Sequence, residues 1–143
     1  MPAYALLAAT LLASAAFGLW WRRRDGRTRA VVDEARLSDA DLALLGLGTL
    51  GERATLVQFS SAFCAPCRAT RRILGEVAEM VDGVTYAEVD AESHLEAARR
   101  FHVLRTPTVL VLDRDRRVVV RASGQPRKVD VLAALGRAVD TAG

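Results

Sequence analysis

The chain has 143 residues, of which 51% are hydrophobic and 26% charged, and its formal net charge at pH 7 is +3. This is the composition of a folded protein rather than a disordered one, and outside one basic cluster there is no broad positive surface for nucleic acid. The two cysteines stand three positions apart, which excludes a disulfide-rich secreted scaffold.

The N-terminal part of the chain is an uncharged apolar run from Ala3 to Trp21 that ends in two tryptophans. As a helix it would be about 28 Å long, close to the roughly 30 Å hydrocarbon core of a bilayer. Tryptophan favours the membrane interface, so we predict a transmembrane helix over residues 3–21. A cleaved signal peptide stays open because Ala13-Ser14-Ala15 resembles a cleavage site, although no basic residue precedes the run. A buried core helix is the third alternative.

A basic stretch follows the apolar run, with arginine at positions 22, 23, 24, 27 and 29. Positive charge beside a membrane segment tends to stay in the cytoplasm. We therefore expect a single-pass protein of the cell membrane, with residues 22–37 as a basic juxtamembrane linker and residues 38–143 as a domain on the cytoplasmic side. The same arginines are suited to contact anionic headgroups, which makes the lipid membrane a predicted partner.

Residues 38–143 alternate between helical and extended patterns, beginning with a short helix for which Ser38 is a suitable N-cap. The elements expected after it are a strand at Ala54–Ser60, a helix from Cys64 to Met80, a strand at Val84–Val89, a helix at Ala91–Phe101, strands at Thr108–Leu112 and Arg117–Ala122, and a last helix carrying Val129 to Val139. The first part is typical of a β-α-β unit with parallel strands, and the second of an antiparallel hairpin followed by a helix. This order predicts an α/β fold with a central mixed sheet flanked by helices.

The tetrapeptide Cys64-Ala65-Pro66-Cys67 lies where a buried strand ends and a helix begins. Unpaired N–H groups and the dipole at a helix N-terminus favour a thiolate, so we expect Cys64 to be exposed and acidic. Pro66 suits the first turn of a helix, and Cys67, one turn further in, would be shielded. This division suits thiol–disulfide exchange, in which one thiol attacks and the other resolves the mixed disulfide. Arg68 and Arg71 either add positive charge near the thiol or lie on an ordinary exposed helix face.

Two other interpretations of the cysteine pair remain open. A tetrahedral zinc site needs two further ligands, and only His94 and His102 are available, eight positions apart on or beside one predicted helix. An inert structural pair is the second. The position of the pair between a strand and a helix of a β-α-β unit favours redox chemistry without a metal over both.

On these residues the chain resembles the thioredoxin family. The resemblance covers about Ala54 to Val139 and rests on ATLVQFSSAFCAPCR, VTYAEVD and RTPTVLVLD, and on Gly124 before the last helix. It implies a thioredoxin-like fold with the cysteine pair at the end of a strand. It also implies that no bound cofactor is needed, that substrates are protein dithiols and disulfides, and that another dithiol donates the electrons.

The resemblance also assigns residues around the cysteines. It implies a cis peptide bond between Thr106 and Pro107, whereas the residues alone leave a trans proline at a strand start open. Phe63 takes the place of the family's usual tryptophan before the first cysteine. The expected substrate groove consists of Phe63, Ala65, Pro66, Thr106 and Pro107.

The sequence departs from the family at positions that bear on proton transfer. Gln58 stands where the family often has a buried aspartate that deprotonates the second cysteine, and Tyr86 replaces a buried lysine opposite it. A glutamine side chain cannot act as a base. Resolution by Cys67 would then be slower, or would use water or another carboxylate. Ala65 replaces the glycine between the cysteines, and Arg72 the proline that kinks the helix.

These observations predict a membrane-anchored thiol–disulfide oxidoreductase of the protein-disulfide reductase type. The alternative from another class is a membrane-tethered redox sensor or docking module that does not turn over, and Gln58 is the residue that favours it. A third possibility is an extracytoplasmic thiol–disulfide oxidoreductase, which depends on the orientation of the anchor. Turnover with insulin as substrate would separate the enzyme from the sensor.

Overall fold

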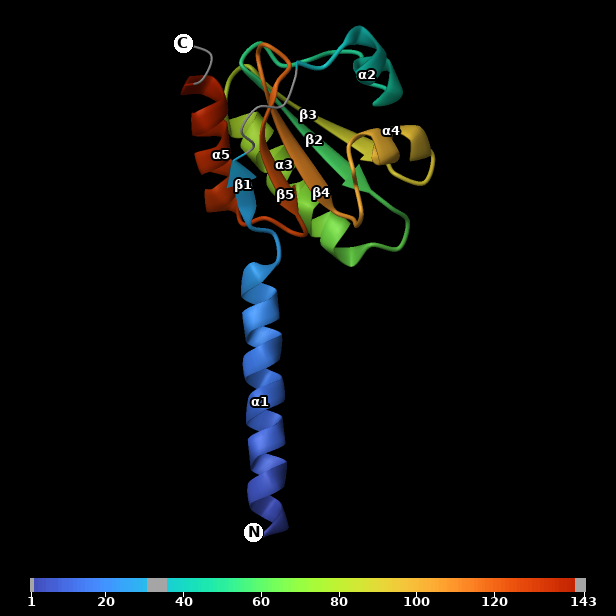
Figure 1. Cartoon of the computed structure of the whole chain (residues 1–143). Helices are drawn as coiled ribbons and strands as arrows, with labels where there is room; N and C mark the ends of the chain where they lie inside the picture. The colour runs from blue at the N-terminus through green and yellow to red at the C-terminus, as the bar shows by residue number, and fades with distance from the viewer. Residues whose placement is uncertain (1, 31–35, 141–143) are drawn as a thin grey trace.

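In the computed structural model, which describes residues 2–30 and 36–140, a long helix stands apart from a five-stranded sheet and its covering helices (Figure 1). The helices are α1 (Ala3–Arg24), α2 (Asp39–Leu44), α3 (Ala65–Met80), α4 (Leu95–Arg100) and α5 (Lys128–Asp140). The strands are β1 (Thr28–Ala30), β2 (Ala54–Ser60), β3 (Val84–Asp90), β4 (Thr108–Asp113) and β5 (Val118–Ser123).

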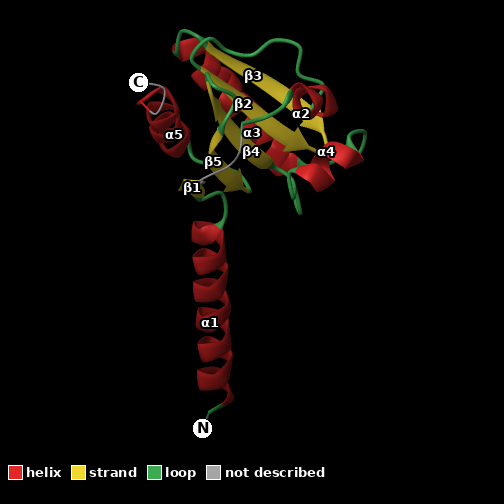
Figure 2. Ribbon diagram, turned by 45° about the horizontal axis from the view of Figure 1, so that its top comes forward, coloured by secondary structure: helices red, strands yellow, loops and turns green. Residues whose placement is uncertain are grey.

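The sheet is mixed and has the strand order β1-β5-β4-β2-β3. β2 pairs in parallel with β3, and α3 connects the two, as expected for a β-α-β unit. β4 pairs antiparallel with both β2 and β5, and β5 pairs antiparallel with β1 (Figure 2). The predicted α/β, thioredoxin-like fold with a mixed sheet flanked by helices is confirmed.

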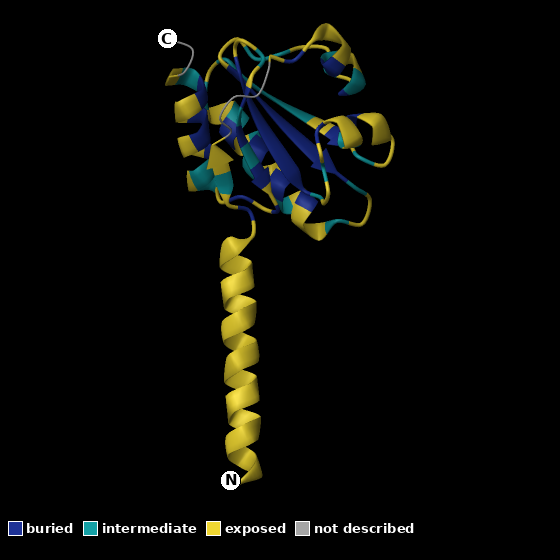
Figure 3. Cartoon of the chain, viewed as in Figure 1, coloured by how far each residue is buried: buried dark blue, intermediate teal, exposed yellow. Residues whose placement is uncertain are grey.

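Both faces of the sheet are covered, so its central strands are buried (Figure 3). α3 and α5 pack on one face through side chains that include Leu74, Val77, Val131 and Leu135. The other face packs against the segments around α2 and α4, through Leu45, Ala97 and Phe101 among others. A strand covered on both faces is apolar throughout rather than alternating, which explains the continuous hydrophobic runs in β2 and β4.

The segment between the apolar helix and the domain is more ordered than the expected linker. α1 continues through Arg24, and Thr28–Ala30 adds an edge strand to β5. Gly26 makes the turn between them with φ at 71°, and its N–H donates to the carbonyl of Ser123, 2.9 Å away. A side chain at Gly26 would collide with the carbonyl of Gln125. The structure thus differs from the expectation over residues 22–30, and residues 31–35 of that segment lie outside the described residues.

α2 and α4 are short helices whose starts are set by local hydrogen bonds. Ser38 is the N-cap of α2, as predicted, and forms a reciprocal capping box with Asp41. α4 begins at Leu95 rather than at the predicted Ala91. The reason is that the carboxylate of Asp90 accepts bonds from the N–H of residue 92 and the hydroxyl of residue 93, which holds this stretch as a turn.

The long helix α1 has no buried residue (Figure 3). It has 22 residues and a mean hydropathy of 1.7 in its most apolar window, and its length is about 33 Å at 1.5 Å per residue. It is long and apolar enough to cross a membrane, and a signal sequence passes the same test. The alternative of a buried core helix is wrong, because no residue of α1 is buried.

Candidate functional site

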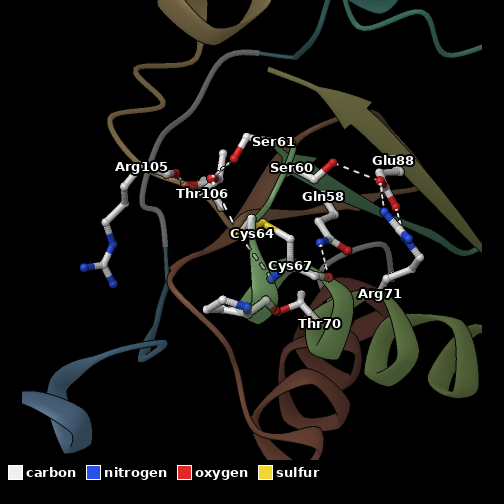
Figure 4. Close-up of a disulfide and its surroundings, with 12 residues drawn as sticks. Gln58, Ser60, Ser61, Cys64, Cys67, Thr70, Arg71, Glu88, Arg105 and Thr106 are labelled. Carbon is white, nitrogen blue, oxygen red and sulfur yellow. Dashed lines mark hydrogen bonds and ion pairs between the residues drawn. A yellow bond between two sulfur atoms is a disulfide. The ribbon is translucent and has the colours of Figure 1, made fainter. Parts of the chain in front are cut away.

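The cysteine pair lies at the junction of β2 and α3 and forms a disulfide (Figure 4). Cys64 is the N-cap of α3, Pro66 lies in the first turn, and the α-carbons of Cys64 and Cys67 are 5.2 Å apart. Cys64 is half-buried rather than fully exposed as expected, whereas Cys67 is only 1% exposed. Cys67 is the shielded member, because a helix that starts at residue 65 turns residue 67 toward the core.

Two hydrogen-bond donors point at the sulfur of Cys64. The backbone N–H of Cys67 lies 3.2 Å from Cys64 Sγ, and the hydroxyl of Thr106 lies 3.9 Å from it. Ser61 shares a 2.7 Å hydrogen bond with the Thr106 hydroxyl and thereby orients it (Figure 4). Both donors, together with the positive end of the α3 dipole, stabilise negative charge on this sulfur when the disulfide opens.

The loop that faces the cysteines is built around the peptide bond between Thr106 and Pro107, which is cis, as the resemblance implied. The carbonyl of Pro107 accepts a 2.7 Å bond from the N–H of Gly124, and the hydroxyl of Thr108 donates to the carbonyl of Arg105. Pro107 is itself buried, and Thr106 is the half-buried residue that faces the disulfide. The loop is thus fastened to β5 directly behind the site.

Several apolar residues close to the cysteines or to Thr106 in the chain are exposed to solvent. Phe63 is fully exposed and has a φ of 58°, so its ring stands clear of the domain. Ala65 and Pro66 are exposed on the first turn of α3. Leu104, on the loop before Thr106, is 95% exposed. Of the residues expected to form a groove, Phe63, Ala65 and Pro66 are exposed next to Cys64 in the chain, Thr106 faces its sulfur and Pro107 is buried, so the groove itself stays a prediction.

Gln58 is completely buried behind the cysteines, at the position that the resemblance indicated. Its amide nitrogen donates to the backbone carbonyl of Cys67 at 2.9 Å, and its amide oxygen accepts from the hydroxyl of Tyr86 at 2.8 Å. Tyr86 does lie opposite Gln58, as expected. Burial raises the pKa of the Tyr86 phenol well above its ordinary value, so neither residue supplies a base at neutral pH.

A carboxylate that the sequence interpretation did not single out completes this network. Glu88 accepts hydrogen bonds from Ser60 at 2.9 Å and from the guanidinium of Arg71, and its carboxylate lies 2.9 Å from the hydroxyl of Tyr86, whose single proton is shared between Glu88 and Gln58. The hydrogen bond from Arg71 lowers the pKa of Glu88 below its ordinary value despite partial burial. The alternation of side chains along β3 would have indicated Glu88, because residues 86 and 88 share one face of the strand.

For Arg71 the structure favours the alternative of an exposed residue on the helix face, whose charge pairs with Glu88 rather than acting on Cys64. Its guanidinium pairs with Glu88 at 2.5 Å, which raises the pKa of Arg71 and neutralises the charge locally (Figure 4). The neighbouring Arg68 lies exposed on the first turns of α3. Of the two arginines considered, only Arg68 is left to favour a thiolate at Cys64.

In the part of the chain that the structure describes, no cluster of metal-ligating side chains supports the interpretation as a metal site. No group of three or more His, Cys, Asp or Glu side chains there could hold an ion. The ring of His94 lies 3.1 Å from the carbonyl of Asp90 at the start of α4, and His102 is exposed beyond its end.

The sequence is similar to known proteins of one family. The sequence profile described as Thioredoxin matches residues 49–136. The thioredoxin of Mycobacterium bovis is 32% identical over 105 residues, which are 73% of this chain and 88% of the relative. The thioredoxin of Mycolicibacterium smegmatis is 32% identical over 118 residues, which are 80% of this chain and 97% of the relative.

Solved structures give the same result. The X-ray structure of Fasciola hepatica thioredoxin superposes with a TM-score of 0.53 and 26% identity, over 61% of this chain and 82% of that one. A mutant thioredoxin from Halobacterium salinarum superposes with a TM-score of 0.56 over 62% of this chain and 76% of that one. At 17% identity the second likeness concerns the fold alone.

Proposed function

Because the chain belongs to the thioredoxin family and holds Cys64 and Cys67 at disulfide distance, it is a thiol–disulfide oxidoreductase, and we propose that it is a membrane-anchored reductase of protein disulfides. The observation that carries the proposal is the position of Cys64. Its sulfur caps α3 and accepts a hydrogen bond from the N–H of Cys67, and both features would stabilise a thiolate on Cys64 when the disulfide opens.

In the proposed reaction the thiolate of Cys64 attacks one sulfur of a substrate disulfide. A mixed disulfide forms, and the second substrate sulfur leaves as a thiolate that takes a proton from water. Cys67 loses its proton to water, and its thiolate then attacks the sulfur of Cys64 and releases the first substrate sulfur, which takes a proton from water. The substrate has gained two electrons and two protons, and the enzyme has the Cys64–Cys67 disulfide described above. A second dithiol must reduce this disulfide to complete the cycle.

The residues around Cys64 are proposed as the surface that receives the substrate. Thr106 and Pro107 would line one side of the attacked disulfide, and Phe63, Ala65 and Pro66 the other. The exposure of Phe63, Ala65 and Pro66 supports this role, as does the closeness of Thr106 to the sulfur of Cys64. Because few polar side chains border the sulfur, recognition would rest on apolar contact and on backbone groups rather than on a charged pocket.

The anchor is proposed to be a single transmembrane span at residues 3–21. The length and hydropathy of α1, its complete lack of buried residues and the arginines at its end support this role. Residues 22–37 would connect the span to the redox domain at 38–143, and β1 within this connection adds an edge strand to the sheet of that domain.

The arginines at residues 22–29 favour a cytoplasmic domain, and a cytoplasmic domain would meet a reducing thiol pool. This is the reason to propose the direction of a reductase. The competing candidate, a sensor that does not turn over, has one observation in its favour, namely that buried Gln58 cannot remove a proton from Cys67.

Two measurements test the two parts of the proposal, which are the reductase activity and the membrane anchoring. The full chain, purified in lipid nanodiscs, is mixed with dithiothreitol and a short peptide whose disulfide holds two self-quenching dyes. A reductase gives many turnovers per enzyme above the background, and the Cys64→Ser variant gives none. A sensor gives a single burst of one turnover, which contradicts the proposal. Alkaline carbonate extraction of membranes leaves an anchored chain in the pellet, whereas a released chain contradicts the anchoring.

A further inference from the structure

The polar end of α1 and the active-site disulfide lie at the same edge of the domain. Figures 1 and 2 show that α1 leaves the domain from the side on which α3 begins, whereas α2 lies on the opposite side. Cys64 caps the beginning of α3 and therefore belongs to the edge next to α1. The name redox edge is used below for Phe63, Cys64 and the loop 104–107.

The connection between α1 and this edge is short and made of specific contacts. Asp25, the C-cap of α1, forms an ion pair with Arg105. Gly26 and Arg105 both donate to the carbonyl of Ser123, at 2.9 and 3.0 Å. Thr28 then pairs with β5. Because the first residues after the helix are already attached to the sheet, the chain has no free length with which to turn the domain away.

The same contacts lead directly to the disulfide. Arg105 precedes Thr106, whose hydroxyl lies 3.9 Å from Cys64 Sγ (Figure 4). Gly124, whose N–H holds the carbonyl of Pro107, leaves so little space that a side chain there would collide with both Asp25 and Arg105. The end of the anchor helix and the loop beside Cys64 are therefore packed against one another.

Basic side chains line the space between α1 and the domain. A cleft of about 950 Å³ lies there, with Trp20 and Trp21 on its anchor side. Its lining includes arginines from the anchor, from β1 and from the redox side of the domain, at positions 24, 27, 29, 105 and 121. Tryptophan marks the membrane–water interface, so guanidinium groups at this level meet anionic headgroups. Attraction to the headgroups would draw this edge toward the bilayer.

The redox edge also exposes large apolar side chains. Phe63, which precedes Cys64 in the chain, is fully exposed, and Leu104, two residues before Thr106, is 95% exposed. Exposed aromatic and aliphatic groups are suited to a site where water is partly displaced by lipid or by the apolar segments of a partner.

From this placement we propose that the redox edge faces the membrane surface, and that the substrates are disulfides of membrane proteins that lie at the lipid–water interface. This inference rests on the proposed anchoring of α1. When α1 spans the bilayer, the attachments at Asp25 and Gly26 keep Cys64 next to the headgroups. A bulky soluble protein is then kept from the disulfide by the bilayer, whereas a segment emerging from a neighbouring transmembrane helix reaches it.

The test compares small and bulky reagents at Cys64. The Cys67→Ser variant of the full chain, in nanodiscs that leave both membrane faces open, is labelled with N-ethylmaleimide or with a polyethylene-glycol maleimide of several kilodaltons. The matched control carries a flexible Gly-Ser insertion between Arg24 and Asp25, which leaves the contacts of Asp25 with the domain intact and lengthens only the tether. We expect the bulky reagent to lose most of its rate on the parent and to regain it on the control, with the small reagent equally fast on both.

A second measurement uses the enzyme with both cysteines. A transmembrane peptide with a disulfide just outside its apolar span is incorporated in the same nanodiscs. The parent should reduce it faster than the control with the insertion, while a short soluble peptide disulfide is reduced equally by both. Equal labelling by the bulky reagent, or no preference for the membrane-bound disulfide, overturns the inference and leaves the proposed reductase standing. Release of the chain by carbonate overturns the anchoring and the inference together, and loss of peptide reduction overturns the proposed activity.

Discussion

The hydroxyl of Tyr86 donates a 2.8 Å hydrogen bond to the amide oxygen of Gln58, whose amide nitrogen in turn holds the backbone carbonyl of Cys67. The buried position behind the resolving cysteine is thus filled by a neutral, fully bonded pair. Such a pair fixes the first turn of α3 at no cost in buried charge. It also leaves Cys67 without a base at this position. The departure from the family should therefore be measurable in the rate of the resolving step.

We predict that Gln58→Asp speeds the resolving step at neutral pH. A carboxyl at this position can accept the proton of Cys67, directly or through a water. Burying a charge beside Tyr86 should lower the free energy of unfolding by about 1–3 kcal/mol. The measurement is the decay of a preformed mixed disulfide on Cys64, followed by rapid quenching. Gln58→Asn is the matched control, because it has the size of aspartate without the carboxylate, and an unchanged decay rate in Gln58→Asp would mean that another group already takes the proton.

The two cysteines should differ sharply in reactivity. We predict that in the reduced folded chain Cys64 is alkylated much faster than Cys67 at neutral pH, since Cys64 is half-buried at the N-terminus of α3 and Cys67 is 1% exposed. Mass spectrometry of the labelled peptide after brief exposure to iodoacetamide gives the two rates. Equal alkylation rates would contradict the assignment of Cys64 as the attacking thiol and Cys67 as the resolving thiol. Cys67→Ser should accumulate mixed disulfides with substrates, and Cys64→Ser should not.

The ion pair between Arg71 and Glu88 predicts a pH-dependent contribution to stability. The pKa of Glu88 is held below its ordinary value of 4.5 by the hydrogen bond from Arg71. A carboxyl with a lowered folded-state pKa stabilises the fold above the ordinary pKa and loses that contribution as the pH falls through the lowered one. Both side chains are partly exposed, so the contribution should be about 1 kcal/mol or less.

Glu88→Gln tests this contribution. The variant should be less stable than the parent at pH 7, and the difference should shrink when denaturant unfolding is repeated at successively more acidic pH. Glu96→Gln, at an exposed position on α4, is the matched control and should follow the parent at every pH. A Glu88→Gln difference that stays constant with pH would show that the carboxylate charge does not stabilise the fold.

The orientation of the anchor gives the last prediction, that the redox domain faces the cytoplasm. Five arginines lie within residues 22–29, next to the C-terminal end of the apolar run, and positive charge beside a membrane segment tends to stay in the cytoplasm. Fusion of alkaline phosphatase after Gly143 should be inactive, and fusion of green fluorescent protein at the same place should fluoresce. Active phosphatase with a dark fluorescent protein would reverse the orientation without affecting the redox chemistry.

Much of the site could be predicted from the sequence because its geometry is local. A cysteine before Ala65-Pro66, at the end of an apolar strand, caps a helix, and a second cysteine three residues on lies inside the first turn. The capping box of Ser38 and Asp41 is local in the same way. These features follow from backbone hydrogen bonds among neighbouring residues, which short sequence patterns determine.

The features missing from the sequence interpretation join segments that are distant along the chain. β1 exists only because the edge of β5 offers it hydrogen bonds, and three residues carry too little pattern to indicate a strand. The partner of Arg71 depends on how β3 packs beside α3, so the sequence showed the charge but not its neutralisation by Glu88. The contact of Asp25 with Arg105 likewise needs the turn at Gly26 and the position of β5. The sequence by itself thus determined the chemistry of Cys64 and Cys67, whereas only the tertiary structure decided which way that chemistry faces, because orientation is set by contacts between residues far apart in the chain.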